Sequence, residues 1–227
     1  MSKLQHALRD VQPHTILGHT FMVEDLATSD LRRIVVGELN RDVYELKSLG
    51  EPRYVLDVGA NIGLFALTAK ALWPRCHLRC FEPHPVNYMS LCANLARNNV
   101  AATRVNKAVT AHGRSIKMVI GADNTGGASG WTSVAKRGDG TIVCPGATLH
   151  NALDGKTHDV VKIDIEGGEH ELLEEFTHWP LIHALVIELH DNPTLRAAGY
   201  TMDGTEELIR NRMRGKPVVI TRCEMGA

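Results

Sequence analysis

Carboxylates and one histidine follow two apolar runs in the second half of the chain. Asp164 comes directly after the run 160–163. Glu188 lies near the end of the run 183–189, and His190 follows that run directly. Alternate residues of a strand point to the same face, so Glu188 and His190 are expected side by side. An imidazole that titrates near neutrality suits a general base, and a carboxylate can share the proton or orient a substrate. We therefore predict Asp164, Glu188 and His190 as catalytic residues.

The same side chains offer an alternative use as metal ligands. Asp164, Glu188 and His190 are expected at the ends of adjacent strands, and their oxygen and imidazole groups suit Mg²⁺ or a transition ion. We keep a divalent metal as an alternative and assign no metal ligand. Glu166 and Glu169 are further candidates for proton transfer, although Glu169, which follows a Gly-Gly pair, is better placed to stabilise the start of a helix.

A glycine turn follows an earlier apolar run, Tyr54–Val58, and leads at once into a helical pattern. Gly59 lets the chain turn sharply and approach a ligand, and the helix start offers unpaired N–H groups. The pattern Gly-Ala-Asn-Ile-Gly lacks a glycine of the dinucleotide fingerprint. Asp57 beside the turn would repel a pyrophosphate and suits a cation. S-adenosylmethionine carries an ammonium and a sulfonium and no phosphate, so we expect it as the ligand.

A second carboxylate supports a nucleoside ligand. Glu82 ends the next apolar run, Leu78–Phe81, and precedes Pro83. An acidic residue about 20 positions beyond such a glycine turn can accept hydrogen bonds from ribose hydroxyls. We predict this role for Glu82.

The elements that must position these residues alternate between strand and helix patterns. Such alternation predicts βαβ units and a Rossmann-like, doubly wound, mostly parallel α/β sheet in a single domain. Expected strands are 54–58, 78–81, 103–109, 160–165, 183–189 and 217–221, and expected helices are 63–73, 85–98, 169–176 and 204–214. Residues 113–143 interrupt this pattern, with expected strands at 115–120 and 141–143. We expect the loop 121–131 and the segment 191–203 to determine substrate specificity, because loops often carry function.

The first fifty residues form an N-terminal lead-in before the domain 51–227. We expect a short helix at 4–11, a short strand at 19–23 and a mostly helical segment at 30–49, ended by Glu51-Pro52. This helical lead-in would serve as a lid or as the surface of a homodimer.

Composition and charge argue against several classes of protein. The chain has 227 residues and a formal net charge of −1, so no overall basic field favours nucleic acid or an anionic membrane. No run approaches the ~20 apolar residues of a membrane span, and the first ten residues lack a signal-peptide core. The five cysteines are odd in number and show no CxxC spacing, which indicates reduced thiols. We expect a cytoplasmic protein.

Three segments together resemble the FkbM-type class I methyltransferases. They are VLDVGANIG, FEPHP and VKIDIEGGE, and the resemblance runs from about Tyr44 to His190. It implies S-adenosylmethionine as methyl donor and a hydroxyl on a small molecule, such as a natural product or sugar, as acceptor. By position it implies contacts to the cofactor from Asp57, Gly59, Ala60, Asn61, Gly63, Glu82, Asn106, Ala108 and Asp164.

The sequence departs from this family at two places. His150 stands where the family usually has an acidic residue after Thr-Leu, and only one strand is obvious near the C-terminus, where class I enzymes usually have an antiparallel pair. Methylation of a peptide or other macromolecule, a dinucleotide-dependent oxidoreductase, and a binding protein without catalysis remain alternatives.

Overall fold

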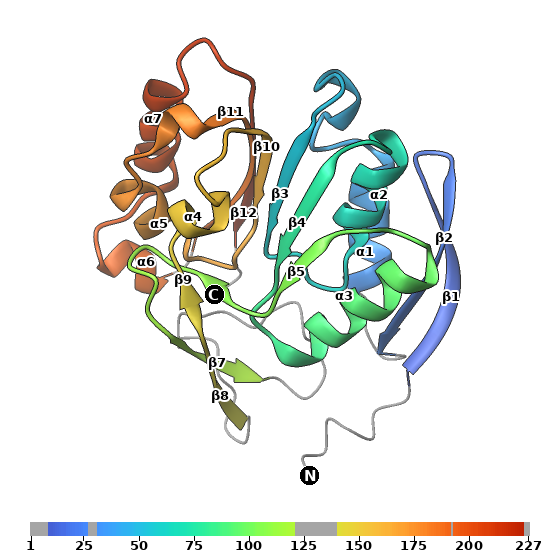
Figure 1. Ribbon diagram of the computed structural model, residues 1–227. Coiled ribbons are helices and arrows are strands. Elements are labelled where there is room, and N and C mark those ends of the chain that lie inside the picture. The colour runs from blue at the N-terminus through green and yellow to red at the C-terminus, as the bar shows by residue number, and fades with distance from the viewer. Residues whose placement is uncertain (1–8, 27–30, 121–139, 192, 225–227) are drawn as a thin grey trace.

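A six-stranded parallel sheet forms the centre of the computed structural model, which describes residues 9–26, 31–120, 140–191 and 193–224 (Figure 1). The strand order is β12-β11-β10-β3-β4-β5, and every neighbouring pair is parallel. The strands are β3 (Tyr54–Val58), β4 (His77–Phe81), β5 (Thr103–Val105), β10 (His158–Ile163), β11 (Ile182–Asp191) and β12 (Val218–Glu224). The predicted Rossmann-like α/β class is confirmed.

Helices cover both faces of the sheet. One face packs against α1 (Leu31–Asn40), α2 (Leu64–Leu72) and α3 (Pro85–Arg97). The opposite face packs against α4 (Leu149–Leu153), α5 (Glu169–Glu175) and α7 (Met202–Arg212), with the short α6 (Pro193–Ala197) preceding α7. Two separate clusters of buried apolar residues fill these layers, as a doubly wound sheet requires.

Strand register assigns the polar residues to one face. Lys162 of β10 is paired with Asp57 of β3 and with Val186 of β11. Because side chains alternate along a strand, Asp57 and Lys162 share the face covered by α1 and α2, and Glu188 and His190 follow Val186 on that face. Leu56 and Val58 point to the opposite core. The register therefore places these four polar residues on the same face of the sheet, the face covered by α1 and α2.

The N-terminal segment differs from its prediction. The helix expected over 4–11 is wrong for its described part, because Arg9 begins the strand β1 (Arg9–Ile16). Positions 4–8 lie outside the described residues. Strand β1 pairs with the antiparallel strand β2 (His19–Leu26). Leu17 and Gly18 both have positive φ, 48° and 86°, the backbone of a two-residue hairpin turn. The expected strand at 19–23 is confirmed within β2. Helix α1 occupies part of the expected helical segment, and a 3₁₀ turn, Leu46–Ser48, follows.

The interrupted middle segment forms two small sheets beside the main one. β6 (Ala108–Val109) pairs with β9 (Gly146–Ala147), and β7 (Ile116–Ile120) pairs with antiparallel β8 (Gly140–Cys144). The strands expected at 115–120 and 141–143 are confirmed. The predicted specificity loop 121–131 lies outside the described residues.

The C-terminal edge of the sheet consists of β12, which is parallel to β11. Within the described part of the chain, no antiparallel strand joins this sheet, so the departure seen in the sequence persists in the structure. None of the described helices is long and apolar enough to cross a membrane.

Candidate active site

The glycine turn lies where the direction of strand order reverses. β3 and β10 are neighbours in the sheet, yet their helices lie on opposite faces, which makes the carboxyl ends of these strands the expected ligand crevice. A cavity of about 360 Å³ opens there, within the usual size range of small-molecule sites. Its wall includes five predicted cofactor residues: Gly59, Asn61, Glu82, Ala108 and Asp164. Asp57, Ala60, Gly63 and Asn106 lie outside its wall.

Gly59 allows two strand ends to touch. Its φ is 81°, and a Cβ atom built on it would lie 1.7 Å from the carbonyl oxygen of Asp164. Only glycine fits this contact. Gly63 acts differently, because it caps the N-terminus of α2 at φ 93° and a Cβ atom built on it would lie only 2.8 Å from Cδ1 of Leu91 in α3. Gly63 thus serves helix packing.

Asn61 and Glu82 form the polar wall of the cavity. The Glu82 carboxylate is buried and accepts hydrogen bonds from the backbone N–H groups of Asn61 (2.8 Å) and His84 (2.9 Å). Burial raises the pKa of Glu82 to about 7, against the effect of these two donors. Asn61 adopts φ 49°, and its buried Oδ1 has no hydrogen-bond partner among the described residues. Both groups retain acceptor capacity for hydroxyls of a ligand.

Asn106 and Ala60 support this wall from behind. The Asn106 side chain donates to the carbonyl oxygens of Glu82 (2.7 Å) and Pro83 (3.0 Å), and the backbone N–H of Ala60 donates to Phe81 (2.9 Å). These bonds fix the backbone between β4 and the glycine turn. Ala108 itself lines the cavity beside apolar Phe81 and Val109, which suits a flat aromatic ring.

Asp57 lies beneath the turn, fully buried. Neither carboxylate oxygen has a hydrogen-bond partner among the described residues, and the nearest cation is the Lys162 ammonium group, 3.8 Å from Oδ1. Burial raises the pKa of Asp57 to about 6, and Lys162 opposes this rise. The direct contact to a cationic ligand that the sequence suggested for Asp57 stays a prediction.

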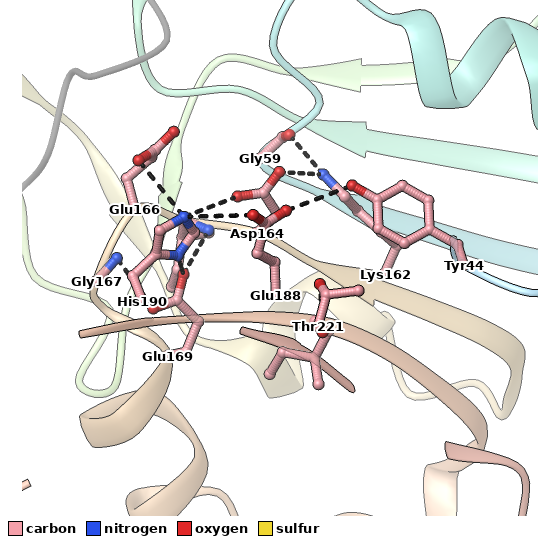
Figure 2. Close-up of polar contacts among 12 residues, drawn as sticks. Tyr44, Gly59, Lys162, Asp164, Glu166, Gly167, Glu169, Glu188, His190 and Thr221 are labelled. Carbon is pink, nitrogen blue, oxygen red and sulfur yellow. Dashed lines mark hydrogen bonds and ion pairs between the residues drawn. The ribbon is translucent and has the colours of Figure 1, made fainter. Parts of the chain in front are cut away.

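Lys162 is a residue that the sequence analysis missed. Its Nζ donates to the carbonyl oxygen of Gly59 (3.1 Å) and to Oδ2 of Asp164 (3.0 Å) (Figure 2). The Lys162 side chain is 6% exposed. The signal was present, since a lysine between Val161 and Ile163 interrupts a run that must be buried, and buried lysines are almost always paired.

His190 is surrounded by carboxylates from three segments. Its Nδ1 lies 3.0 Å from Glu169 Oε1, and its Nε2 lies 3.6 Å from Glu166, 3.9 Å from Asp164 and 3.9 Å from Glu188 (Figure 2). The structure therefore brings together the three predicted catalytic residues, Asp164, Glu188 and His190.

The expectation that His190 titrates near neutrality is wrong. Burial by itself lowers the pKa of His190, but the Cys223 side chain and the Glu169 carboxylate, with Glu166 close by, raise it to about 12. These neighbours therefore favour the protonated imidazole, which disfavours His190 as the group that accepts a proton. Its positive charge instead holds the carboxylates together.

Glu169 orients the loop between β10 and α5. Its fully buried carboxylate accepts hydrogen bonds from the backbone N–H groups of Ile165 (2.8 Å) and Gly167 (2.9 Å) as well as contacting His190. This agrees with a role in organising the start of a helix. The loop also holds Glu166 at φ 58°, a left-handed conformation, on the wall of the cavity.

Two carboxyl groups in the cluster have elevated pKa values. Burial, reinforced by Asp164, raises the pKa of Glu166 to about 8 and that of Glu188 to about 6, and the His190 charge opposes both shifts. Tyr44 donates to Glu188 Oε2 at 3.4 Å, so the N-terminal lead-in contributes to this site.

Donor atoms suited to a cation also occur here. One set is Glu188, His190 and Cys223, and the other is Asp164, Glu169 and His190, with the atoms of each set within 4.8 Å of one another. The Glu169 oxygens and the His190 ring already engage each other and the loop backbone. We assign no metal ligand, and the alternative stays a prediction.

The Rossmann-like α/β fold with a cavity at the ends of β3 and β10 is compatible with a methyltransferase. The Methyltransferase FkbM domain matches residues 57–212, more than half of the chain. The chain belongs to the FkbM methyltransferase family.

Curated relatives agree with this family. Methyltransferase sdnD of Sordaria araneosa is 27% identical, over 67% of this chain and 72% of its own length. The 31-O-demethyl-FK506 methyltransferase FkbM of Streptomyces tacrolimicus is 29% identical, over 60% of this chain and 65% of its own. A solved SAM-dependent methyltransferase from Agrobacterium tumefaciens shares the fold, with a TM-score of 0.50 at 13% identity. That match covers 97% of this chain and 62% of the other, so this chain spans less than two thirds of the solved one.

Proposed function

We propose that this protein transfers a methyl group from S-adenosylmethionine to a hydroxyl group of a small molecule, such as a natural product or a sugar. The observation that carries the proposal is the cavity at the β3–β10 switch point, where the Gly59 turn, Glu82 and two carboxylates of the β10 loop form one wall. The name of the Streptomyces relative, which specifies a 31-O position, supports oxygen as the acceptor atom.

The residues present fit the cofactor. Gly59 lets the ends of β3 and β10 meet at the cavity wall, and Glu82 and the unpaired Oδ1 of Asn61 offer acceptors for ribose hydroxyls. Asp164 supplies negative charge near the position expected for a cation. S-adenosylmethionine, when bound, supplies an electrophilic methyl group on a sulfonium.

The chain's own residues would align and deprotonate the acceptor. Glu166 lines the cavity, and a carboxyl group whose pKa is raised to about 8 accepts a proton from a hydroxyl far better than an ordinary glutamate does. Asp164, held by Lys162, would orient the hydroxyl. His190 and Glu188 would keep these carboxylates in place, which replaces the proton-accepting role first expected of His190.

Calorimetric titration with S-adenosylhomocysteine, with NAD as control and with and without Mg²⁺, tests the cofactor. We expect binding of S-adenosylhomocysteine alone, and Glu82→Gln should weaken it about ten-fold because one charged acceptor is lost. Binding of NAD, or of neither ligand, contradicts the proposal. A magnesium-dependent affinity would support the metal alternative.

The acceptor is tested by mass spectrometry of reaction mixtures that contain hydroxylated small molecules or peptides. A gain of one methyl group on a hydroxyl oxygen, located by NMR, is the expected result. Methylation confined to peptides or to nitrogen would instead support the macromolecular alternative.

A further inference from the structure

Lys162 occupies an unusual position for a charged residue. It lies in β10, a strand with neighbours on both sides, and the lysine residue is only 4% exposed. Burying an ammonium group costs several kcal/mol unless charged and polar partners compensate, so its partners define what it does.

Its partners belong to two different strand ends. Nζ donates to the Gly59 carbonyl of the turn after β3 and to the Asp164 carboxylate after β10, while Asp57 lies 3.8 Å away. Gly59 and Asp164 both line the cavity, and their backbones are already in contact because Gly59 has no Cβ. Lys162 thus connects the end of β3, at Gly59, with the end of β10, at Asp164.

Neighbouring aromatic groups restrict the ammonium group further. Its Nζ lies 6.0 Å from the centre of the Phe65 ring of α2, and Tyr44 approaches from the lead-in. Burial alone would lower the pKa of Lys162, but Asp164 and Asp57 raise it above its ordinary value. These carboxylates therefore favour the charged form of the Lys162 ammonium group.

We propose that Lys162 is a positioning residue of the cofactor site, which fixes the Gly59 turn and the Asp164 carboxylate in the geometry that binds S-adenosylmethionine. This inference rests on the proposed function. Lys162 does not touch the ligand in this scheme and acts only through Gly59 and Asp164.

The test compares Lys162→Met with the unchanged protein and with Lys156→Met, which alters an exposed lysine on the loop before β10. We expect the dissociation constant for S-adenosylhomocysteine to rise about ten-fold or more in Lys162→Met, since a charged hydrogen bond is lost on each side of the site. Lys156→Met should bind as the unchanged protein does.

A second pair of variants separates positioning from simple charge neutralisation. Lys162→Met leaves Asp57 buried without a cation and can fail to fold, so we add Asp57→Asn and the double variant Asp57→Asn/Lys162→Met. If Lys162 only neutralises Asp57, the double variant binds S-adenosylhomocysteine as Asp57→Asn does, and the inference is overturned. If Lys162 positions the turn, the double variant binds about ten-fold more weakly than Asp57→Asn, although both unfold at similar temperatures.

The outcomes also distinguish this inference from the proposed function. An unchanged protein that does not bind S-adenosylhomocysteine overturns the proposed function. An unchanged protein that binds it, with Lys162→Met binding equally well, overturns only the role of Lys162.

Discussion

At the scale of single residues, the carboxylates around His190 decide which groups can exchange a proton. An isolated histidine titrates near neutrality, but here the folded environment keeps the imidazole protonated and raises the pKa values of Glu166 and Glu188 instead. The candidate base therefore moves from the histidine to a neighbouring glutamate. Only the distances among these groups reveal this, because the pKa of each depends on all the others.

Glu166 makes the stability of the protein depend on pH. Its pKa is about 8 in the folded chain against 4.5 ordinarily, so the folded chain retains a proton that the unfolded chain has lost between these values. The resulting stabilisation is complete below pH 4.5 and disappears as the pH rises through 8. We expect the fall in melting temperature from pH 5 to pH 9 to be smaller in Glu166→Gln than in the unchanged protein.

Glu175→Gln, at an exposed position at the end of α5, is the matched control for this measurement. It should preserve the pH dependence of the unchanged protein. Parallel melting curves for Glu166→Gln and the control would show that Glu166 is not the group responsible.

At the scale of elements, Asn94 of α3 and Asn98, which follows the last residue of α3, attach the β1–β2 hairpin to the domain. Asn94 accepts from the backbone N–H of Glu24 (2.7 Å) and donates to its carbonyl oxygen (3.0 Å), and Asn98 makes the same pair of bonds to Met22. Residues four apart on a helix thereby match residues two apart on a strand. Asn94 also donates to Ile62 and is fully buried, whereas the bonds of Asn98 to Met22 are exposed.

This difference in burial predicts that alanine substitutions at the two asparagines lower the free energy of unfolding by unequal amounts. Asn94→Ala leaves the buried carbonyl of Ile62 and the partly buried backbone groups of Glu24 without these partners, and we expect it to lower the free energy of unfolding by about 1–3 kcal/mol. Asn98→Ala should lower the free energy of unfolding less, because water replaces its exposed hydrogen bonds to Met22. Urea denaturation gives both free energies, and hydrogen exchange at the Glu24 amide reports local release. Equal costs would contradict a buried attachment.

At the scale of the whole molecule, the N-terminal lead-in shares the main hydrophobic core. Ile16, Phe21, Val23, Leu39 and Leu46 are buried in the same cluster as α2 and β3. Tyr44 from this lead-in reaches Glu188 in the site. This packing favours a lead-in that is integral to the domain over a detachable lid, and the boundary between 1–50 and 51–227 stays a prediction, as does a homodimer.

Removing residues 1–50 should therefore abolish cooperative folding. The remaining chain 51–227 would expose the apolar surface that the lead-in covers, and we expect it to aggregate or to unfold without a sharp transition in circular dichroism. A fragment with the same unfolding free energy and the same affinity for S-adenosylhomocysteine as the full chain would instead establish the lead-in as a separate lid.

The sequence by itself determined the features that depend on local chemistry. Alternating strand and helix patterns predicted the parallel sheet, and the glycine turn with Glu82 indicated the strand ends at which the structure has a cavity, because turn geometry and strand ends follow from nearby residues. It missed the β1–β2 hairpin, whose Leu17-Gly18 turn gives a weak signal. Lys162 beneath the turn and the protonated state of His190 were decided only by the tertiary structure, since strand register sets which charges from distant segments meet in a buried space.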